Sequence, residues 1–401
     1  MVSKKPKILL YFVLLCISTA GLSFFSAGIW GEKPETLPET ASLTITQDMT
    51  LAEFGHINNI SNEILKKAFN LESKQDLQKS PAQLGLSHGE IISRVEKARA
   101  ISSEYESKNW LKIPIKFALW FAFLITVFIL MRRGRINYMN RKWYYLAAII
   151  IFGIILGSDP SPMGTIKDAI VLLGASGVIF PPRMIALTIF LILVFLANKY
   201  ICSWGCQFGV LQDLVFRINR SKKDRRGIFR QYKPSFAVLN TIRIIFFAVF
   251  TVVAFLWGYD IISLVDPFRI FHPVVLAVTG GLFIAAILIA ALFIYRPWCS
   301  LFCPFGLTGW LVEKISLFKI RVDYDSCIAC EACSRACPST VMEAILKREK
   351  VIPDCFACGT CIETCPTNSI GLRSGKRTRP PEGKFADREK KEVGRKLIEE
   401  G

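Results

Sequence analysis

Long apolar stretches separated by charged segments run through most of the 401 residues. A helix of about 20 apolar residues spans the hydrocarbon core of a bilayer. On that basis the pattern predicts six membrane spans, at residues 8–30, 113–131, 143–158, 184–201, 236–259 and 274–295. A further apolar run, residues 169–182, is too short to span and is expected to be re-entrant or interfacial.

The first apolar run allows two interpretations. It follows Lys4, Lys5 and Lys7 and contains no charge, which is typical of an uncleaved membrane anchor. The small residues Ser26, Ala27 and Gly28 also offer a cleavage point, so a signal peptide remains the alternative. Both interpretations place the next segment on the exported side.

Residues 31–112 form a polar stretch that predicts a compact helical domain. Apolar residues recur at steps of three and four over residues 51–69, with Thr50 as the expected N-cap, and a second helix is expected from His88 to about Tyr105. His56 and His88 are isolated in the sequence, so we expect them to be surface residues and not metal or haem ligands.

Composition and charge support a multi-pass membrane protein. The chain is 52% hydrophobic with 30 Phe, and its formal net charge is +18. The positive charges concentrate in alternate loops: residues 132–142 carry five cationic and no acidic residues, and residues 199–233 carry nine and two. This follows the positive-inside rule, which favours a membrane topology over nucleic-acid binding.

The predicted fold class is an α-helical polytopic membrane protein with a C-terminal α+β ferredoxin domain. The expected parts, in chain order, are an anchor or signal peptide (1–30), the small helical exported domain (31–112), a second span with a basic cytoplasmic loop (113–142), two membrane hairpin repeats (143–234 and 235–316), the ferredoxin domain (317–372) and a charged tail (373–401).

The ferredoxin domain is predicted by two cysteine runs, CIACEACSRACP and CFACGTCIETCP, between Cys327 and Pro366. Each has the spacing Cys-x2-Cys-x2-Cys-x3-Cys-Pro, in which the fourth Cys ligates the other run's [4Fe–4S] cluster. The expected ligands are Cys327, Cys330, Cys333 and Cys365 for one cluster and Cys355, Cys358, Cys361 and Cys337 for the other. Zinc sites and a disulfide framework are the alternatives, and two copies of the full spacing disfavour both.

A second group of cysteines lies in an internal repeat. Residues 202–218 and 299–315 align without gaps with eight identities in 17 positions, and each contains a Cys-x3-Cys pair, Cys202/Cys206 and Cys299/Cys303. If these segments are helical, each pair lies on one helical face. The four thiols could form a third redox or metal centre, act as redox-active dithiols, or simply pack.

The combination of two hairpins ending in Cys-x3-Cys and a following double cluster motif resembles the NapH/MauN-type membrane ferredoxins and the membrane half of NosR-type proteins. The resemblance covers residues 143–370 and implies electron transfer between the quinol pool and respiratory or maturation partners. It places Cys202, Cys206, Cys299 and Cys303 on the family's paired-cysteine motifs. The sequence departs from the pattern at Gln207, where the family usually has Pro, and it contains neither a flavin-attachment sequence nor a Cys-x2-Cys-His haem site.

Two residues outside the cysteine motifs are candidates for a quinol site. His272 lies in an outer turn beside Asp266 and Arg269, and Arg243 lies inside the fifth expected span. A solvated loop histidine and an arginine that reaches the interface are the simpler interpretations. Because the clusters are expected in the cytoplasm, a quinol site near the inner leaflet is favoured.

The sequence therefore predicts a bacterial inner-membrane electron-transfer protein that relays single electrons through two [4Fe–4S] clusters, with quinone as a substrate. It would be a subunit of an oxidoreductase system, with membrane lipid, the quinone pool or a membrane oxidoreductase, and a redox protein as partners. The alternative is a membrane redox sensor or assembly factor that uses the clusters or the paired cysteines. A transporter is less favoured, since the spans carry few polar groups.

Overall fold

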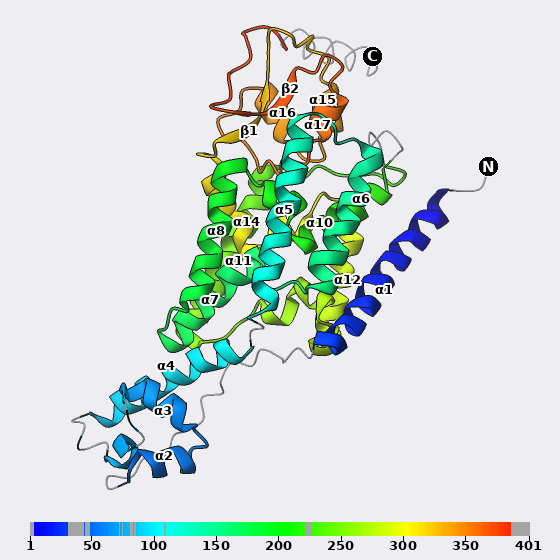
Figure 1. Cartoon of the computed structure of the whole chain (residues 1–401). Coiled ribbons are helices and arrows are strands. Elements are labelled where there is room, and N and C mark those ends of the chain that lie inside the picture. Colours follow the sequence, from blue (N-terminus) through cyan, green and yellow to red (C-terminus); the bar gives the residue numbers. More distant parts are fainter. Residues whose placement is uncertain are drawn as a thin grey trace.

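The computed structural model describes residues 4–30, 44, 49–71, 73, 75–80, 83, 86–107, 110–220 and 227–385. A small helical module, a helix bundle and a ferredoxin domain follow one another along the long axis of the molecule (Figure 1). The two ends of the bundle are named below after the parts attached to them, the module end and the ferredoxin end.

The helical module consists of α2 (Leu51–Ile57), α3 (Asn62–Phe69), the 3-10 turn η1 (Gln75–Gln78) and α4 (His88–Ser107). Thr50 caps α2 as expected, in a capping box with Glu53. The single helix expected over residues 51–69 is wrong, because Asn59 adopts a positive φ of 53° and Ser61 caps a new helix. His56 is exposed, and His88 begins α4.

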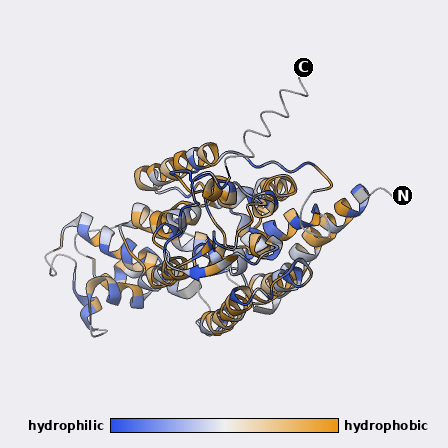
Figure 2. Ribbon diagram, turned by 90° about the horizontal axis from the view of Figure 1, so that it is seen from above, coloured by the Kyte–Doolittle hydropathy of each residue, from blue (hydrophilic) through white to orange (hydrophobic). Residues whose placement is uncertain are grey.

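The bundle is built from helices of very different length. Its longer members are α1 (Lys4–Trp30), α5 (Lys112–Arg132), α6 (Tyr138–Ala148) with the π-helical turn η3 (Ile149–Ile155), α7 (Pro162–Ser176), α8 (Pro181–Ala197), α11 (Phe236–Trp257) and α12 (Val278–Ala291). Three short 3-10 turns, η4 (Ser263–Val265), η5 (Pro267–Phe271) and η6 (Pro273–Val275), connect α11 to α12. Hydrophobic residues dominate the bundle helices, whereas the module is more hydrophilic (Figure 2).

Three helices of the described residues are long and apolar enough to cross a membrane: α1 over Lys5–Gly28, α5 over Lys112–Arg132 and α11 over Phe236–Trp257. The helices α8 and α12 are apolar but shorter. The expected fourth and sixth spans therefore end early, α8 at Ala197 and α12 at Ala291. The apolar run at 169–182 belongs to two helices, because α7 ends at Gly177 in the left-handed conformation and Pro181 begins α8.

Four short helices fill the space that the shortened helices leave. They are α9 (Tyr200–Trp204) and α10 (Gln207–Ile218) after α8, and α13 (Pro297–Leu301) and α14 (Pro304–Glu313) after α12. The helix α10 packs against η3, α6 and α12, and α14 packs against α7 and α8. After α8 and again after α12, the chain thus turns back into the bundle before it leaves at the ferredoxin end.

The ferredoxin domain closes on a two-stranded antiparallel sheet. Strand β1 (Phe318–Val322) pairs with β2 (Ile370–Ser374) in the register Ile320 opposite Leu372. The short helices α15 (Ala332–Ala336), α16 (Val341–Leu346) and α17 (Thr360–Thr364) lie between the strands in sequence. The domain is fixed to the bundle by Arg141, which donates to Thr360 and forms an ion pair with Glu363, both at 3.2 Å.

Candidate functional site: two cysteine constellations joined at Phe356

The two cysteine runs have the same backbone conformation. In the first run Ala329 and Glu331 have φ of 53°, and in the second run Ala357 and Gly359, at the equivalent positions, have φ of 48° and 79°. Alternation of left-handed and ordinary residues turns successive backbone N–H groups toward one side, which forms a concave anion-binding nest. Each run therefore has the backbone form that cradles an anionic group beside its cysteines.

The fourth cysteine of each run lies with the other run. Cys333 interacts electrostatically with Cys365, Cys327 and Cys330. Cys361 interacts in the same way with Cys337, Cys358 and Cys355, and more weakly with Cys333. The helices α15 and α17, which precede the two fourth cysteines, pack on each other and bring about this exchange. These neighbours agree with the exchange that the spacing predicts, and the assignment of four ligands to each cluster stays a prediction.

Hydroxyl groups accompany several of these thiols. The pairs are Cys337 with Ser339 at 3.6 Å, Cys358 with Thr360 at 3.5 Å and Cys365 with Thr367 at 3.6 Å. Burial raises the pKa of the Cys365 thiol, but hydrogen bonds from the side chain and backbone of Thr367 lower it. The net result is a pKa below the ordinary value. A lowered pKa favours the thiolate, which is the form that ligates iron.

The donor set fits iron–sulfur clusters. All eight cysteines are free thiols, so the described residues contain no disulfide framework there. No three His, Cys, Asp or Glu side chains of the described residues are close enough to hold a single metal ion. The thiolates around a cubane bind four different irons and need not converge on one point.

The four paired cysteines line one cavity inside the bundle, of about 350 Å³ including the space on its open side. The condition under which each pair would lie on one helical face is not met, because each helix breaks between its two cysteines. Cys202 lies in α9 and Cys206 precedes α10, and Cys299 and Cys303 have the same positions relative to α13 and α14. The breaks turn all four thiols toward a common space, which two continuous helices would not do.

Two glycines permit this close packing in both repeats. A Cβ on Gly209 would lie 2.5 Å from the carbonyl oxygen of Cys202, and a Cβ on Gly306 would lie 2.4 Å from that of Cys299. Any side chain would therefore collide with backbone. These glycines occupy equivalent positions of the repeat, seven residues after the first cysteine of each pair.

Two fully buried cations flank the cavity and cross from one repeat to the other. Lys199 and Arg296 lie three residues before Cys202 and Cys299 respectively. The Lys199 Nζ donates to the carbonyl oxygen of Gly306 at 2.9 Å, and the Arg296 Nη1 donates to that of Cys202 at 2.5 Å. Gln212 adds a hydrogen bond of 3.5 Å to the Cys299 Sγ. The two cations thus satisfy backbone carbonyl groups beside the cavity, and Gln212 is the residue of these three that donates to one of its thiols.

Both cations have buried counter-ions. Asp213 pairs with Arg296 at 2.6 Å and also accepts from the hydroxyl groups of Tyr145 and Tyr295, at 3.0 and 2.9 Å. Lys199 pairs with Asp354 at 3.1 Å. Burying a charge is costly unless it is paired and hydrogen-bonded, so these networks allow the cations to remain in the interior.

Phe356 joins the two constellations. It follows the expected cluster ligand Cys355 and also lines the cavity of the paired cysteines. Lys199 and Arg296 lie over its ring, at 4.7 and 5.0 Å from the centroid. Next to it, the indole of Trp204 donates to the carbonyl oxygen of Ala357 at 3.2 Å. The Phe356 side chain therefore lies between a predicted cluster ligand, Cys355, and the cavity of the paired cysteines.

The two residues suggested for quinol do not form one site. Arg243 is buried and pairs with Asp354 at 2.7 Å, so it faces the ferredoxin domain. His272 lies between η5 and η6, in the connection at the module end of the bundle. The expectation that Arg243 reaches the interface as a solvated charge is not met, because its guanidinium is held in a buried ion pair.

Sequence reasoning missed Lys199, Arg296, Asp354 and Phe356. The two cations could have been found, since both precede a repeat cysteine by three residues and are basic in an otherwise apolar setting. Asp354 and Phe356 could not have been found in this way. They flank Cys355 in the sequence without a recurring pattern, and their contacts are with residues that are distant in the sequence.

Comparison with known proteins agrees with both constellations. A family described as a 4Fe-4S dicluster domain matches residues 319–366. A family described as a 4Fe-4S binding domain matches twice, at residues 179–226 and 276–323, one match on each copy of the repeat. No solved structure matches the chain.

Three relatives share part of the chain. YccM of Escherichia coli, named as a candidate electron transport protein, is 28% identical over 39% of this chain and 46% of its own length. The uncharacterized protein MJ0749 of Methanocaldococcus jannaschii is 26% identical over 57% of this chain and 82% of its own length. Protein NirI of Paracoccus denitrificans is 26% identical over 57% of this chain and 36% of its own length. The match thus spans under half of YccM and NirI.

The fold, the cysteine runs and these matches define an iron–sulfur protein of the ferredoxin class with apolar helices of membrane-spanning length. The matches and the cysteine motifs support a membrane-bound 4Fe–4S polyferredoxin-type family. Iron–sulfur electron transfer is the general function of this class.

Proposed function

We propose that the protein is a membrane-bound electron carrier that passes single electrons between the quinone pool and a redox partner protein. The ferredoxin domain would hold two [4Fe–4S] clusters, one on Cys327, Cys330, Cys333 and Cys365 and the other on Cys355, Cys358, Cys361 and Cys337. The matching backbone nests and the exchange of the fourth cysteines support this assignment. When bound, such clusters supply one-electron transfer.

We propose a third iron–sulfur centre on Cys202, Cys206, Cys299 and Cys303. The observation that carries this proposal is the convergence of four thiols from two repeats on one cavity. The hydrogen bond from Gln212 to the Cys299 sulfur and the two buried cations beside the thiols also favour the thiolate form, which a ligand to iron needs. A dithiol pair would need only two of the four thiols.

The position of this cavity suggests a route for electrons through the bundle. Pro162 and Phe268, from the connections at the module end, line it on one side, and Phe356 of the ferredoxin domain lines it on the other. A centre in the cavity would lie between the two ends of the bundle. It would serve as an intermediate carrier between a site in the outer half of the membrane and the clusters in the cytoplasm.

We infer an orientation in the bacterial inner membrane with the ferredoxin end in the cytoplasm and the module exported. The basic loops at the ferredoxin end support it, and we take the chain to cross the membrane six times. On this topology α9 with α10, and α13 with α14, are re-entrant elements that enter from the cytoplasmic side. Non-helical backbone at membrane depth is tolerated only where protein buries it, as it is at these two breaks.

Iron and sulfide analysis of the full-length protein, purified anaerobically, tests the centres. We expect about twelve irons per chain, about four for each of three clusters. Cys299→Ser should lower the content to about eight and leave the two ferredoxin signals in the EPR spectrum unchanged. An iron content of about eight that Cys299→Ser does not alter would exclude the third centre, and an iron content near zero would exclude the function.

Reduction by a quinol tests the carrier role directly. We expect a soluble quinol analogue to reduce the clusters of wild-type protein in nanodiscs, and Cys202→Ser or Cys299→Ser to stop this reduction while dithionite still reduces the ferredoxin clusters. A sensor or assembly factor would instead keep its quinol-driven electron flow in both variants.

A further inference from the structure

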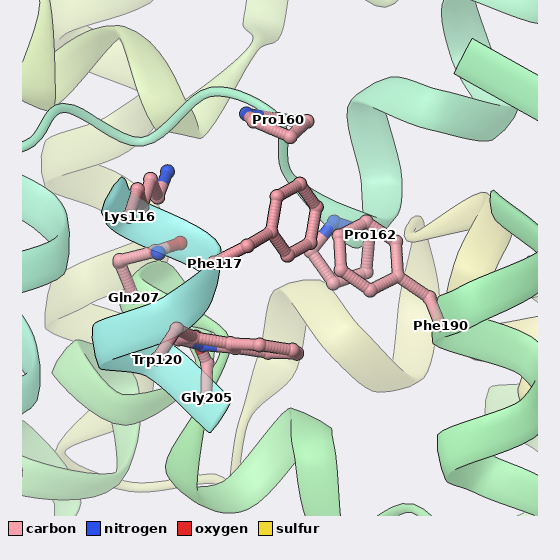
Figure 3. Close-up of a pocket in the computed structure, with 8 residues that line it drawn as sticks. All are labelled: Lys116, Phe117, Trp120, Pro160, Pro162, Phe190, Gly205 and Gln207. Atoms are coloured by element: carbon pink, nitrogen blue, oxygen red, sulfur yellow. The ribbon is translucent and has the colours of Figure 1, made fainter. Parts of the chain in front are cut away.

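A second hollow lies beside the cavity of the paired cysteines, between α5 and α8. It encloses about 260 Å³ up to its open side and is lined by Lys116, Phe117, Trp120, Pro160, Pro162, Phe190, Gly205 and Gln207. Figure 3 shows the rings of Phe117, Trp120 and Phe190 around it, with Lys116 and Gln207 at one edge. We call it the aromatic hollow.

The walls of the aromatic hollow are three rings that pack against one another. The ring centroids of Phe117 and Phe190 are 6.1 Å apart, and those of Trp120 and Phe190 are 5.7 Å apart. The Trp120 indole is fixed by its hydrogen bond of 2.9 Å to the carbonyl oxygen of Gly205. Aromatic side chains bind planar groups by offset or edge-to-face contacts.

One polar group in the hollow has no partner. Gln207 is 2% exposed, and its side-chain oxygen makes no hydrogen bond within the described residues. Leaving such a buried acceptor unpaired costs roughly 1–3 kcal/mol, so a partner is expected. An amide can accept from a hydroxyl or donate to a carbonyl, which suits a ligand that carries either group.

The repeat shows that this polar group is specific to one side. The position equivalent to Gln207 in the second copy is Pro304, which has no side-chain donor or acceptor. The polar side chain at this position is therefore a feature of the first copy. Lys116 adds a positive charge at the same edge, held by the carbonyl oxygens of Gly157 and Asp159, both at 2.8 Å.

The hollow is adjacent to the proposed third centre. Gly205 and Gln207 are the chain neighbours of Cys206, and Pro162 lines both the hollow and the cysteine cavity. Exposed apolar side chains on the two flanking helices, such as Ile125 at 58% and Ile185 at 61%, would face lipid in a membrane. A ligand in the hollow could thus reach the lipid phase while its ring lies beside Cys206.

We propose that the aromatic hollow binds the head group of a membrane quinone, with the Gln207 amide bonded to a ring oxygen and the isoprenoid tail in the lipid. This inference rests on the proposed electron-carrier function and adds the location of its lipid-phase substrate. An acyl chain also fits aromatic walls, but it offers nothing to Gln207. The hollow is small for a complete ligand, as expected if only the ring enters.

A different hollow of about 470 Å³ lies where the bundle meets the ferredoxin domain, lined among others by Tyr232, Leu239 and Asp354. Its carboxylate is already paired with Arg243 and Lys199. It is the competing location, nearer the inner leaflet, and the test below includes it.

Binding of decylubiquinone and menadione to full-length protein in nanodiscs, followed by quenching of tryptophan fluorescence, tests the proposal. We expect Gln207→Leu and Phe117→Ala each to weaken binding by about tenfold. Ile125→Ala, a truncation of an exposed residue on the same helix as Phe117, is the matched control and should bind as wild type. Because Phe117 is remote in sequence from the cysteines, its variant separates ring binding from damage to the third centre.

Several results would overturn the inference. These are no binding of either quinone to wild type, wild-type affinity in both Gln207→Leu and Phe117→Ala, or loss of affinity in Leu239→Trp alone. Iron analysis of the same samples distinguishes the two proposals. Wild-type protein that holds its iron but binds neither quinone contradicts only the site, whereas wild-type protein that binds a quinone but lacks iron contradicts only the carrier function.

Discussion

Two glycines set the geometry of the paired cysteines. Gly209 and Gly306 lie so close to the carbonyl oxygens of Cys202 and Cys299 that the packing of each repeat depends on the absence of a side chain. Sequence alignment of the two copies shows that both positions are glycine, but only the structure shows what they contact.

We predict that Gly306→Ala destabilises the protein, by about 1–3 kcal/mol, because the added Cβ meets backbone that cannot move aside. The measurement is thermal unfolding in detergent, together with the iron content. Gly281→Ala is the control, since its Cβ would meet only a Leu276 side-chain atom, at an ordinary contact distance of 3.8 Å. Equal melting temperatures for Gly306→Ala and wild type would contradict the packing described above.

Asp354 is the shared counter-ion of two buried cations. Arg243 and Lys199 pair with it at 2.7 and 3.1 Å, and all three side chains are almost entirely buried. Removing one partner of a buried pair leaves an uncompensated charge.

We predict that Asp354→Asn costs about 3–5 kcal/mol of stability for this reason. Asp76→Asn, which breaks the surface pair with Lys79, should change the stability much less, because water screens an exposed pair. Denaturant titration of both variants checks the difference. Similar losses in the two variants would show that the junction does not depend on the Asp354 carboxylate.

At the scale of the elements, sequence periodicity predicted the long helices well and the short ones poorly. The helix α11 begins at Phe236 as expected, whereas the breaks at Gly205 and Phe302 inside the paired-cysteine segments were not foreseen. An apolar pattern indicates which residues are buried. It does not distinguish a continuous buried helix from a broken one, because both give the same pattern. The local features that decide the break act through tertiary packing.

The first helix of the module is fixed at its start by the capping box of Thr50 and Glu53, with hydrogen bonds of 2.8 and 3.2 Å. We predict that Thr50→Ala destabilises α2 by about 1 kcal/mol, because an orphan backbone N–H loses its acceptor. Hydrogen–deuterium exchange of residues 51–57 checks this. Lys67→Ala, at an exposed position of α3, is the control and should leave the exchange of residues 51–57 unchanged. Exchange in Thr50→Ala as slow as in wild type would contradict the role of the cap.

At the scale of the whole molecule, the cysteine spacings predicted the ferredoxin domain and its two groups of thiols. They also draw attention to the paired cysteines, whereas the quinol role of Arg243 and His272 stays a prediction. Arg243 and His272 were chosen because they are unusual in apolar surroundings, and such residues are often structural. The aromatic hollow could not be found this way, since Phe117, Trp120, Phe190 and Gln207 come from three separate segments.

The orientation of the molecule can be checked with single cysteines and a membrane-impermeant maleimide, located by mass spectrometry. We predict that Met139→Cys, 57% exposed at the ferredoxin end, is labelled in inside-out vesicles, and that Ile57→Cys, 54% exposed in the module, is labelled in intact cells. Ile125→Cys, midway along α5, should react from neither side. Labelling of residues 57 and 139 from the same side would contradict the proposed topology.

The crossed hydrogen bonds of Lys199 and Arg296 have a consequence for biogenesis. Each half of the repeat supplies a cation to the backbone of the other, so the first half leaves the ribosome with a buried lysine whose acceptor has not yet been translated. Its two thiols also await partners from nearly a hundred residues downstream. The first repeat is therefore expected to stay incompletely packed until the second repeat has been inserted. The cavity of the paired cysteines can be filled only after that step.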